Sequence, residues 1–527
     1  MTARRRELIK GTVTVGAASL FGPPLGAGPG HTPTVLPDVW DETADVIVIG
    51  SGFAGLAAAI EARTAGAHTI VLEKMAAPGG NSVINGGIMT AVGSPQQRRR
   101  GIADSPERLA DDMLRAGRRM SRPDKVRLVA DASEANYRWT VETLGVRWNE
   151  RVLGHESGHS VPRHVVTATG SGDAIVKKML GKLDSLGVSL RLGTYVERIF
   201  RNADGRAVGL RIREGWQFGV PTSGMPKTIR ATRAIVLCHG GFCADVAYRE
   251  RLDPSLTKRW ETTNQPGATS ELWRETSRIG CAQVHNDWIQ LVPWCSPHER
   301  GMGLAWRFSQ AGAAEHGVWI STSGKRFVNE LADRKVRSDA ILAQEAHGFR
   351  ALAICNGSNL SAYRTACPGE LEKLVKRGIV REFAMLNEVA TAYQMPTSLL
   401  RDTVDRFNEA VVAKRDPDFD RVFSDDQLPL TQGPWYVAEM TPKVHHCMGG
   451  LVTDLQCRVL DISTNLPIPG LYAAGEATSG VHGAVRLGAC ATLDCLVNGR
   501  TAGREAAASA RTVFGSIAGP FISSQSG

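Results

Sequence analysis

A glycine-rich turn near the N-terminus has the residue types and the spacing that bind the phosphates of a dinucleotide. Gly50, Gly52 and Gly55 form the pattern G-x-G-x-x-G. The first glycine permits a tight turn, the second lets the backbone approach a pyrophosphate at a helix N-terminus, and the third allows close helix packing. Glu73 lies 23 positions after Gly50, where an acidic side chain accepts a hydrogen bond from a ribose hydroxyl. The alternative is a tight turn without a ligand.

The sequence also predicts the elements that must position this turn. Residues 46–49 read as a buried strand before the turn, an apolar helix follows as far as Ala65, and residues 69–73 read as a second buried strand. Strand, turn, helix and strand in this order are typical of a Rossmann-like α/β domain with a parallel sheet. This context favours dinucleotide binding over an empty turn.

The composition is that of a large globular protein with an excess of positive charge. The chain has 527 residues, of which 43% are hydrophobic, and a formal net charge of +9. This length can bury large cores and is typical of two to four domains. Lys and Arg are spread along the chain, whereas nucleic-acid binding needs a clustered basic face, so we exclude that class. A positive surface suits an anionic substrate or an acidic redox partner.

Three segments together carry a family resemblance: residues 45–55, residues 444–450 and residues 470–488. From residue 42 to residue 508 the chain resembles the flavoprotein of the fumarate reductase and succinate dehydrogenase superfamily, in its soluble flavocytochrome c branch. The resemblance implies FAD as the cofactor. It also implies a Rossmann-like FAD-binding domain in two parts, 42–290 and 446–510, interrupted by an α+β substrate-capping domain at 291–445.

The resemblance implies which residues hold FAD. Residues 79–87 resemble a flavin-contacting loop in which succinate dehydrogenases carry a histidine bonded covalently to the flavin; Asn81 and Ser82 stand here instead, so we expect non-covalent FAD. Glu476 resembles the acidic residue on the flavin ribityl chain, although a carboxylate near a helix dipole is the alternative. The predicted cofactor-binding residues are Gly50, Ser51, Gly52, Ala54, Gly55, Glu73, Lys74, Gly79, Gly80, Asn81, Gly86, Gly87, Gly241, Gly475 and Glu476.

Three further residues match the family's catalytic positions. Arg334 ends a segment whose final arginine, in the family, donates a proton to the substrate during reduction of a carbon–carbon double bond. His446 and Arg486 match the residues that hold a substrate carboxylate over the flavin, and an arginine fork suits a carboxylate. An arginine is an unusual acid, but beside a developing carbanion in a site without water it can supply a proton. The alternative for Arg334 is an ion pair with Glu330, one helical turn earlier.

Two departures from the family pattern argue against fumarate as the substrate. The family's Gln-Ala-His-Pro, whose histidine binds a second carboxylate, has Val292 in the histidine position here, and Trp294 follows. The family's Glu-x-x-Arg proton relay is absent from residues 308–317. A second carboxylate would lose its hydration without gaining a partner, so we expect a monocarboxylate with an apolar or aromatic substituent. Further candidates for substrate contact, in a loop resembling one that closes over the flavin, are His159 and Arg163.

These residues predict an FAD-dependent reductase of the double bond of an α,β-unsaturated carboxylate. Reduced flavin would deliver hydride to the β-carbon, Arg334 would protonate the α-carbon, and Arg486 and His446 would hold the carboxylate. One alternative is a dehydrogenase that desaturates its substrate, as ketosteroid dehydrogenases do; those enzymes rely on tyrosines, of which this chain has seven. The other is a flavin-binding electron carrier, which would leave the three polar residues without a joint purpose.

The cysteines and the N-terminal residues bear on partners and location. None of the ten cysteines forms C-x-x-C or C-x-x-C-H, so we expect no metal site and no haem on this polypeptide; electrons from a c-type cytochrome must come from a separate protein. Residues 1–30 have a twin arginine, a short apolar run and a Pro/Gly-rich break, the order of a Tat signal. We therefore expect a periplasmic protein, with at most a transient membrane contact through that signal, and a polar tail at 511–527.

Overall fold

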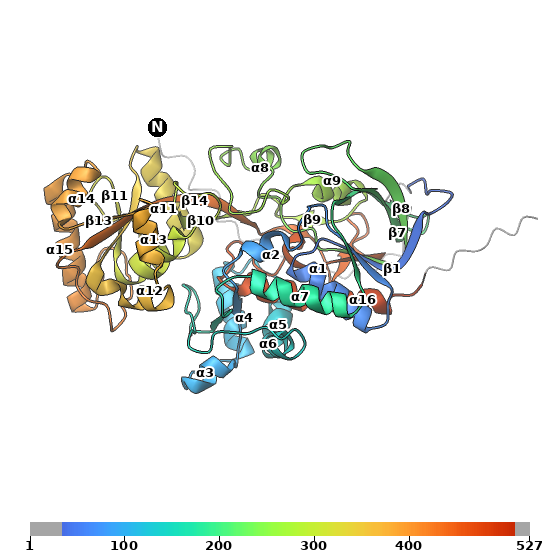
Figure 1. Ribbon diagram of the computed structural model, residues 1–527, viewed down its shortest axis with the longest axis horizontal. Helices are drawn as coiled ribbons and strands as arrows, with labels where there is room; N and C mark the ends of the chain where they lie inside the picture. Colours follow the sequence, from blue (N-terminus) through green and yellow to red (C-terminus); the bar gives the residue numbers. More distant parts are fainter. Residues whose placement is uncertain (1–33, 512–527) are drawn as a thin grey trace, which may run out of the picture.

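The computed structural model describes residues 34–511, so the predicted export signal and nearly all of the predicted tail lie outside the described residues. The described chain forms two bodies side by side (Figure 1). The larger body is built on an eight-stranded sheet, and the smaller body on a five-stranded sheet. Among residues 34–511, no helix combines the length and the apolar character needed to cross a membrane.

The eight-stranded sheet has a parallel centre, as the sequence predicts. Its main path runs β16-β17-β8-β1-β2-β5, in which the neighbours from β17 to β5 are parallel. The hairpin β6-β7 joins the sheet through β8. The strands are β1 (Glu42–Ile49), β2 (Thr69–Leu72), β5 (Ser189–Arg191), β6 (Thr194–Arg201), β7 (Ala207–Glu214), β8 (Met225–Leu237), β16 (Arg458–Leu460) and β17 (Pro467–Ala473). The continuous apolar run 46–49 is buried on both faces: Val46 and Val48 pack with the helix after β1 and with the C-terminal helix, and Ile47 and Ile49 pack with residues of β6 and β7.

Helices from both ends of the described chain cover one face of this sheet. α1 (Phe53–Thr64) begins directly after β1, and it packs against α16 (Cys490–Ala508) and α7 (Asp173–Ser185) (Figure 1). The C-terminal helix therefore lies beside the N-terminal nucleotide-binding turn. Three further helices lie below this layer in the view: α4 (Pro106–Ala116), α5 (Pro123–Asp131) and α6 (Ser133–Glu142).

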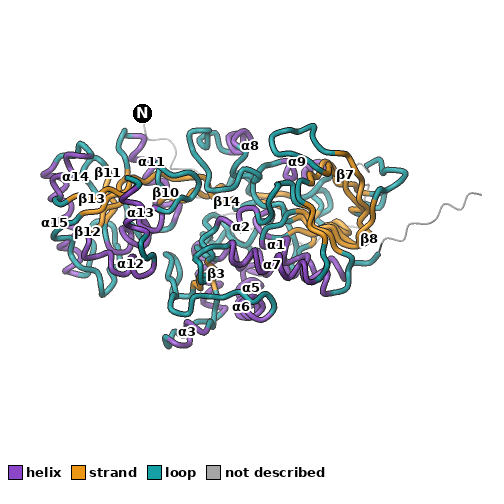
Figure 2. The backbone as a smooth tube through the Cα atoms, viewed as in Figure 1, coloured by secondary structure: helices purple, strands orange, loops and turns teal. Residues whose placement is uncertain are grey.

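The five-stranded sheet lies within residues 289–447, close to the range in which we predict the capping domain. Its strands are β10 (Ile289–Cys295), β11 (Val318–Ser321), β12 (Ala351–Asn356), β13 (Val380–Phe383) and β14 (Trp435–Cys447), all paired antiparallel. β14 is long and runs from this sheet toward the larger body (Figure 2). Its last residues can therefore reach a site between the two bodies.

Two helices of the smaller body matter for the site and for its core. α11 (Arg334–Ala346) packs on β10, and Asp333 caps it by accepting a hydrogen bond from the backbone N–H of Val336 at 2.9 Å. α15 (Thr397–Ala413) is amphipathic as predicted: its buried face consists of Leu400, Val404, Phe407, Ala410 and Val411. α11 thus presents its first residues to β10, and α15 serves the core.

Candidate active site

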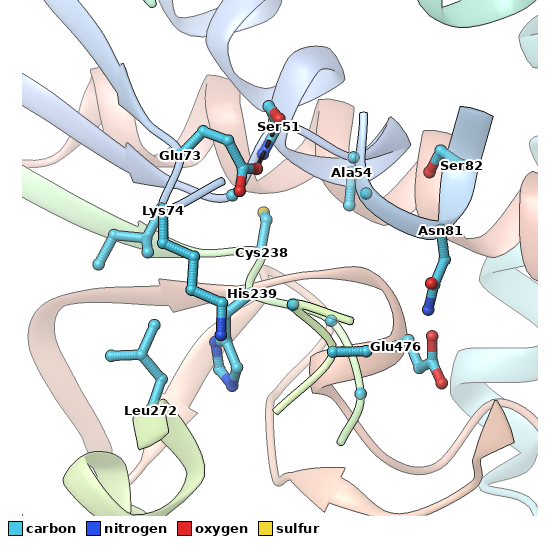
Figure 3. A pocket seen from close by; sticks show the side chains of 18 of the residues that line it. Ser51, Ala54, Glu73, Lys74, Asn81, Ser82, Cys238, His239, Leu272 and Glu476 are labelled. Carbon is cyan, nitrogen blue, oxygen red and sulfur yellow. Dashed lines mark hydrogen bonds between the residues drawn. The ribbon is translucent and has the colours of Figure 1, made fainter. Parts of the chain in front are cut away.

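A cavity of about 920 Å³ lies where β1, β2 and β8 end, with Ile49, Leu72 and Cys238 in its lining. In parallel α/β sheets, ligands bind at the carboxyl ends of the strands. Figure 3 shows Glu73 and Lys74 at one end of this cavity and Asn81 and Glu476 at the other. The predicted cofactor residues that line it are Gly50, Ser51, Gly52, Ala54, Glu73, Lys74, Gly80, Asn81, Gly241 and Glu476.

The turn after β1 has the backbone that the glycine pattern predicts. Gly50 has a φ of +100°, and a Cβ placed there would lie 2.3 Å from the carbonyl oxygen of Cys238. Ser51 donates to Glu73 through its backbone N–H at 3.1 Å and through Oγ at 2.6 Å, which fixes the acidic side chain at the cavity edge. The N-terminal end of α1 borders the cavity at Gly52 and Ala54, so the positive end of the helix dipole faces it.

The far end of the cavity carries a buried carboxyl group. Glu476 accepts a hydrogen bond from the backbone N–H of Cys447 at 2.9 Å, and Nδ1 of His446 lies 3.3 Å away. Burial raises the pKa of Glu476 to about 7. His239 also lines the cavity, and its Nδ1 is buried without a hydrogen-bond partner in the protein. The cavity therefore has polar groups at both ends and an unpartnered imidazole nitrogen on His239, an arrangement that fits a long dinucleotide such as FAD.

Five predicted cofactor glycines do not line the cavity, so their contact with FAD stays a prediction. A Cβ at Gly55 would lie 1.9 Å from the carbonyl oxygen of Gly50, so this glycine lets α1 pack against the turn. Gly87 packs against Thr167 and Ser171 rather than against the cavity. At all of these glycines except Gly86, an added Cβ would lie under 3.0 Å from a neighbouring atom, so the absence of a side chain shapes the surrounding backbone. The five are Gly55, Gly79, Gly86, Gly87 and Gly475.

A second cavity, of about 730 Å³, lies between the two bodies and is strongly cationic. Its lining carries five arginines against the carboxylates of Glu156 and Asp333. Three of these arginines are buried: Arg334 and Arg337 in the first turn of α11, and Arg486 in the segment before α16. Such a cavity suits an anion, because an anion there would gain several charge-assisted hydrogen bonds.

Arg334 faces this cavity as predicted, and its alternative partner is engaged elsewhere. Glu330 is fully buried and pairs with Arg326 at 2.9 Å and Arg421 at 3.0 Å. The guanidinium group of Arg334 instead donates from Nη2 to Oε2 of Glu156 at 2.9 Å. The structural alternative, an Arg334–Glu330 ion pair, is therefore wrong.

Trp294 stacks against two of the arginines. Cζ of Arg334 lies 5.0 Å from the centre of the indole ring, and Cζ of Arg337 lies 4.5 Å from it. Nη1 of Arg337 also donates to Oε1 of Gln310 at 2.7 Å. Burial, and then the neighbouring charge of Arg334, lowers the pKa of Arg337 to about 9. The indole ring thus holds the cationic groups in place and gives the cavity an aromatic wall.

His445, not His446, contacts Arg486, and this is a correction. Nε2 of His445 lies 3.1 Å from Nη2 of Arg486, whereas His446 lies beside Glu476 and stacks edge-on against His482. Adjacent residues of a strand point to opposite faces, so a prediction one residue out selects the wrong face of β14. His445 therefore lies on the Arg486 side of the strand, and His446 lies on the FAD side.

Three further predicted substrate contacts lie outside the lining of this cavity. Arg163 is fully buried and pairs with Asp104 at 2.8 Å and Asp112 at 2.6 Å, so it is structural. His159 accepts a hydrogen bond from Arg163 and donates one to the carbonyl of Gly488; His159 and Arg163 do not line the cavity. Val292 is also absent from the cavity lining and packs in the core of the smaller body. Of the predicted substrate-binding residues, Trp294 lines the cavity.

Four residues of this region were missed by sequence reasoning: Glu156, Gln310, Arg337 and His445. Arg337 could have been predicted from its spacing to Arg334, because residues at i and i+3 share one face of a helix. Gln310 and Glu156 come from segments whose approach to α11 depends on tertiary contacts. No local pattern marks them.

Comparisons with known proteins agree with this architecture. A family model described as "FAD binding domain" matches residues 45–492. The acrylate reductase flavoprotein subunit of Shewanella woodyi is 35% identical and covers 95% of this chain and 97% of its own length. The urocanate reductase of Eggerthella lenta is 31% identical, covering 88% of this chain and 74% of its own. The chain therefore belongs to this FAD-binding flavoprotein family, and FAD is its cofactor.

Solved structures place the fold in the same group. The open conformation of a flavocytochrome c3 fumarate reductase matches with a TM-score of 0.71 and 29% identity, over 89% of this chain and 79% of that chain. A 3-ketosteroid-Δ4-(5α)-dehydrogenase from Rhodococcus jostii RHA1 matches with a TM-score of 0.69 at 23% identity, over 90% of this chain and 99% of that chain. This second likeness is one of fold alone.

Proposed function

We propose that the protein reduces the carbon–carbon double bond of an α,β-unsaturated monocarboxylate. The observation that carries the proposal is the cationic cavity, in which buried Arg334, Arg337 and Arg486 surround a space beside the FAD-binding cavity. Arg486 contacts His445, and the next residue of β14, His446, lies 3.3 Å from Glu476 of the FAD cavity, so the end of β14 links the two cavities. A substrate carboxylate at Arg486 would therefore lie next to the flavin.

Each polar residue of the cavity would have its own role in the reduction. Arg486, oriented by His445, binds the substrate carboxylate and stabilises the charge that develops on it. Arg334 holds a proton at its guanidinium group and transfers it to the α-carbon. The bound reduced FAD supplies the hydride for the β-carbon. Arg334 and Arg486 are themselves buried, which strengthens their interactions with an anion.

Two observations favour reduction over desaturation. The cavity lining holds no tyrosine and carries arginines next to the FAD site. Two of the relatives that the chain resembles are, by name, an acrylate reductase and a urocanate reductase, and a third is a fumarate reductase, whereas the ketosteroid dehydrogenase likeness is limited to the fold. A cationic site next to FAD supports protonation and charge stabilisation on a carboxylate.

The aromatic wall supports a substrate with an apolar or flat group opposite its carboxylate. Because Val292 lies in the core, this expectation rests on Trp294 alone. A second carboxylate against the face of the indole ring would lose its hydration there. Arg337 and Gln310 also line the cavity, and Nη1 of Arg337 donates to Gln310 at 2.7 Å, while Nε of Arg337 and Nε1 of Trp294 are buried donors without a partner among the described residues. We propose a monocarboxylate rather than fumarate because the face of the indole ring favours an apolar group.

Steady-state assays with a reduced viologen as donor test the substrate class. We expect kcat/KM for acrylate-like, methacrylate-like, urocanate-like or cinnamate-like enoates to exceed that for fumarate by about tenfold or more, since an unpaired charged hydrogen-bonding group costs about 1.5–3 kcal/mol. Trp294→Ala should reduce this preference, and Trp294→Phe should retain most of it. Fumarate as the best substrate would overturn the choice of monocarboxylate, and no reoxidation by any enoate would overturn the reductase.

We also propose export by the Tat route and a separate electron-donor protein, such as a c-type cytochrome. The support is the twin arginine at Arg5 and Arg6 and the lack of C-x-x-C-H in the sequence. Changing both arginines to lysine should leave folded, FAD-loaded protein in the cytoplasm. Fractionation of cells that express either version measures this, and periplasmic delivery of the lysine variant would rule out Tat dependence.

A further inference from the structure

Glu156 is the carboxylate in direct contact with the arginine to which the proposed function gives the proton. Its Oε2 accepts a hydrogen bond from Nη2 of Arg334 at 2.9 Å. Glu156 comes from the loop between α6 and β4, far from α11 in sequence, and it lines the same cavity as Arg334. The proposed function gives Arg334 a task that leaves it without a proton, and it assigns nothing to Glu156.

Packing against the backbone of Gly488 fixes the position of the Glu156 side chain. A Cβ placed on Gly488 would lie 1.5 Å from Oε2 of Glu156, so the carboxylate occupies the space that any other residue at 488 would fill. Gly488 itself lines the cavity two residues after Arg486. The absence of a side chain at position 488 is therefore what admits the carboxylate to Arg334.

Glu156 is also the more accessible partner of the pair. Its side chain is 24% exposed, whereas that of Arg334 is 10% exposed. The cavity opens past Arg118 and Asp333, whose side chains are 46% and 38% exposed and lie 3.6 Å apart. A proton from water can therefore reach Glu156 more readily than it can reach Arg334.

The electrostatics couple the two protonation states. Burial alone would raise the pKa of Glu156, but Arg334, with His164 and Arg486, lowers it to about 2. When Arg334 has lost its proton, the charge that most strongly lowers the pKa of Glu156 is gone, and burial still favours the neutral carboxyl form of Glu156. Glu156 then gains proton affinity at the moment when Arg334 needs a proton. Other groups that interact electrostatically with Glu156 are His159, Glu315, Arg337 and His445.

We propose that Glu156 returns a proton from water to Arg334 after each turnover. In this step, which rests on the proposed function, a water proton binds the Glu156 carboxylate, the resulting carboxyl O–H gives its proton to the neutral guanidine of Arg334, and the carboxylate is restored. No electron moves, and one proton enters for each proton that the substrate takes. Glu156 thus acts through Arg334 as a positioning and relay residue, without contact to the reacting carbon.

The test separates the first turnover from the later ones. Holoenzyme with Glu156→Gln is reduced anaerobically and mixed rapidly with an enoate that the wild-type enzyme accepts. Because Arg334 begins protonated, the first reoxidation of the flavin should stay within about twofold of the wild-type rate, while steady-state kcat should fall by about tenfold to a hundredfold, toward the lower range for proton-transfer catalysis. Glu156→Asp should restore part of kcat, and Gly488→Ala, which displaces the carboxylate, should reproduce the loss in steady state.

The matched control is Glu42→Gln, because Glu42 is a carboxylate of similar exposure, 30%, that pairs with Arg191 far from the cavity. Its first turnover and its kcat should both equal those of the wild type. An unchanged kcat in Glu156→Gln would overturn the relay. A first turnover slowed as much as kcat would also overturn it, and would show that Glu156 has a purely structural role. A wild-type flavin that no enoate reoxidises would overturn the proposed function and the relay with it.

Discussion

Arg486 and His445 lie 41 residues apart, yet Nη2 of Arg486 lies 3.1 Å from Nε2 of His445. A guanidinium group can only donate, so Nε2 must accept, and Nδ1 carries the proton toward Oγ1 of Thr263 at 2.7 Å. Burial, and then the charges of Arg486 and Arg334, lowers the pKa of His445 well below its usual range. His445 is therefore neutral and orients Arg486 without adding charge to the cavity.

The two adjacent histidines should give different phenotypes. His445→Ala removes the acceptor that orients Arg486, so KM for the enoate should rise by about tenfold, the cost of a lost charged hydrogen bond, with a smaller change in kcat. His446→Ala should instead alter the affinity for FAD, because His446 lies beside Glu476. Steady-state kinetics and FAD titration of the two variants measure this. The reverse pattern would contradict the assignment of the two faces of β14.

Arg334→Ala should retain FAD and still bind the enoate, but it should lose about 10²-fold to 10⁴-fold in kcat, the usual contribution of general acid catalysis. Lys335→Ala is the control, since Lys335 is the next residue of α11 and pairs with exposed Asp339. Turnover and a substrate-binding titration on the oxidised enzyme check both. A near-wild-type rate in Arg334→Ala would reduce Arg334 to a structural partner of Glu156.

The purified protein should be yellow, and acid or heat should release its FAD into the supernatant. The reason is that Asn81 and Ser82 are engaged within the fold, with Asn264 at 2.7 Å and with the N–H of Phe53 at 2.9 Å, and neither offers an imidazole for a covalent bond. The absorbance of the supernatant after precipitation measures the released flavin. Flavin that stays with the precipitated chain would refute non-covalent binding.

The FAD-free protein should lose stability as pH falls from 7 to 5.5. Six histidines have pKa values lowered by burial, so the unfolded chain takes up protons there that the folded chain does not, and the free energy of unfolding decreases. Three carboxyl groups with raised pKa values, Glu315, Glu345 and Glu476, oppose this but are fewer. The six histidines are His159, His164, His239, His316, His445 and His446.

Thermal unfolding followed by circular dichroism across this pH range checks the expectation. The carboxylates with lowered pKa values titrate below the window and do not enter it. His446→Asn should flatten the dependence, because it removes one buried group that must stay neutral in the folded state. A melting temperature that rises on acidification would contradict the predicted loss of stability.

Features that depend on local spacing could be predicted from the sequence. The glycines at 50, 52 and 55, the apolar runs on either side and Glu73 predict the strand, turn and helix that the structure contains. Arg334 and Arg486 were also predicted, because each lies in a segment that resembles a family motif. Short-range backbone sterics and hydrophobic periodicity act within a few residues, so a linear pattern is enough to specify them.

Tertiary structure alone decided which polar side chains meet. Arg163 pairs with two buried aspartates, and Val292 packs in a core. His445 rather than His446 contacts Arg486, because neighbouring residues of a strand point to opposite faces. Glu156 reaches Arg334 across 178 residues, through a gap left by the glycine at position 488. Such pairs depend on packing between elements that are distant in sequence, and the energy of a buried ion pair exists only when both partners have been brought together.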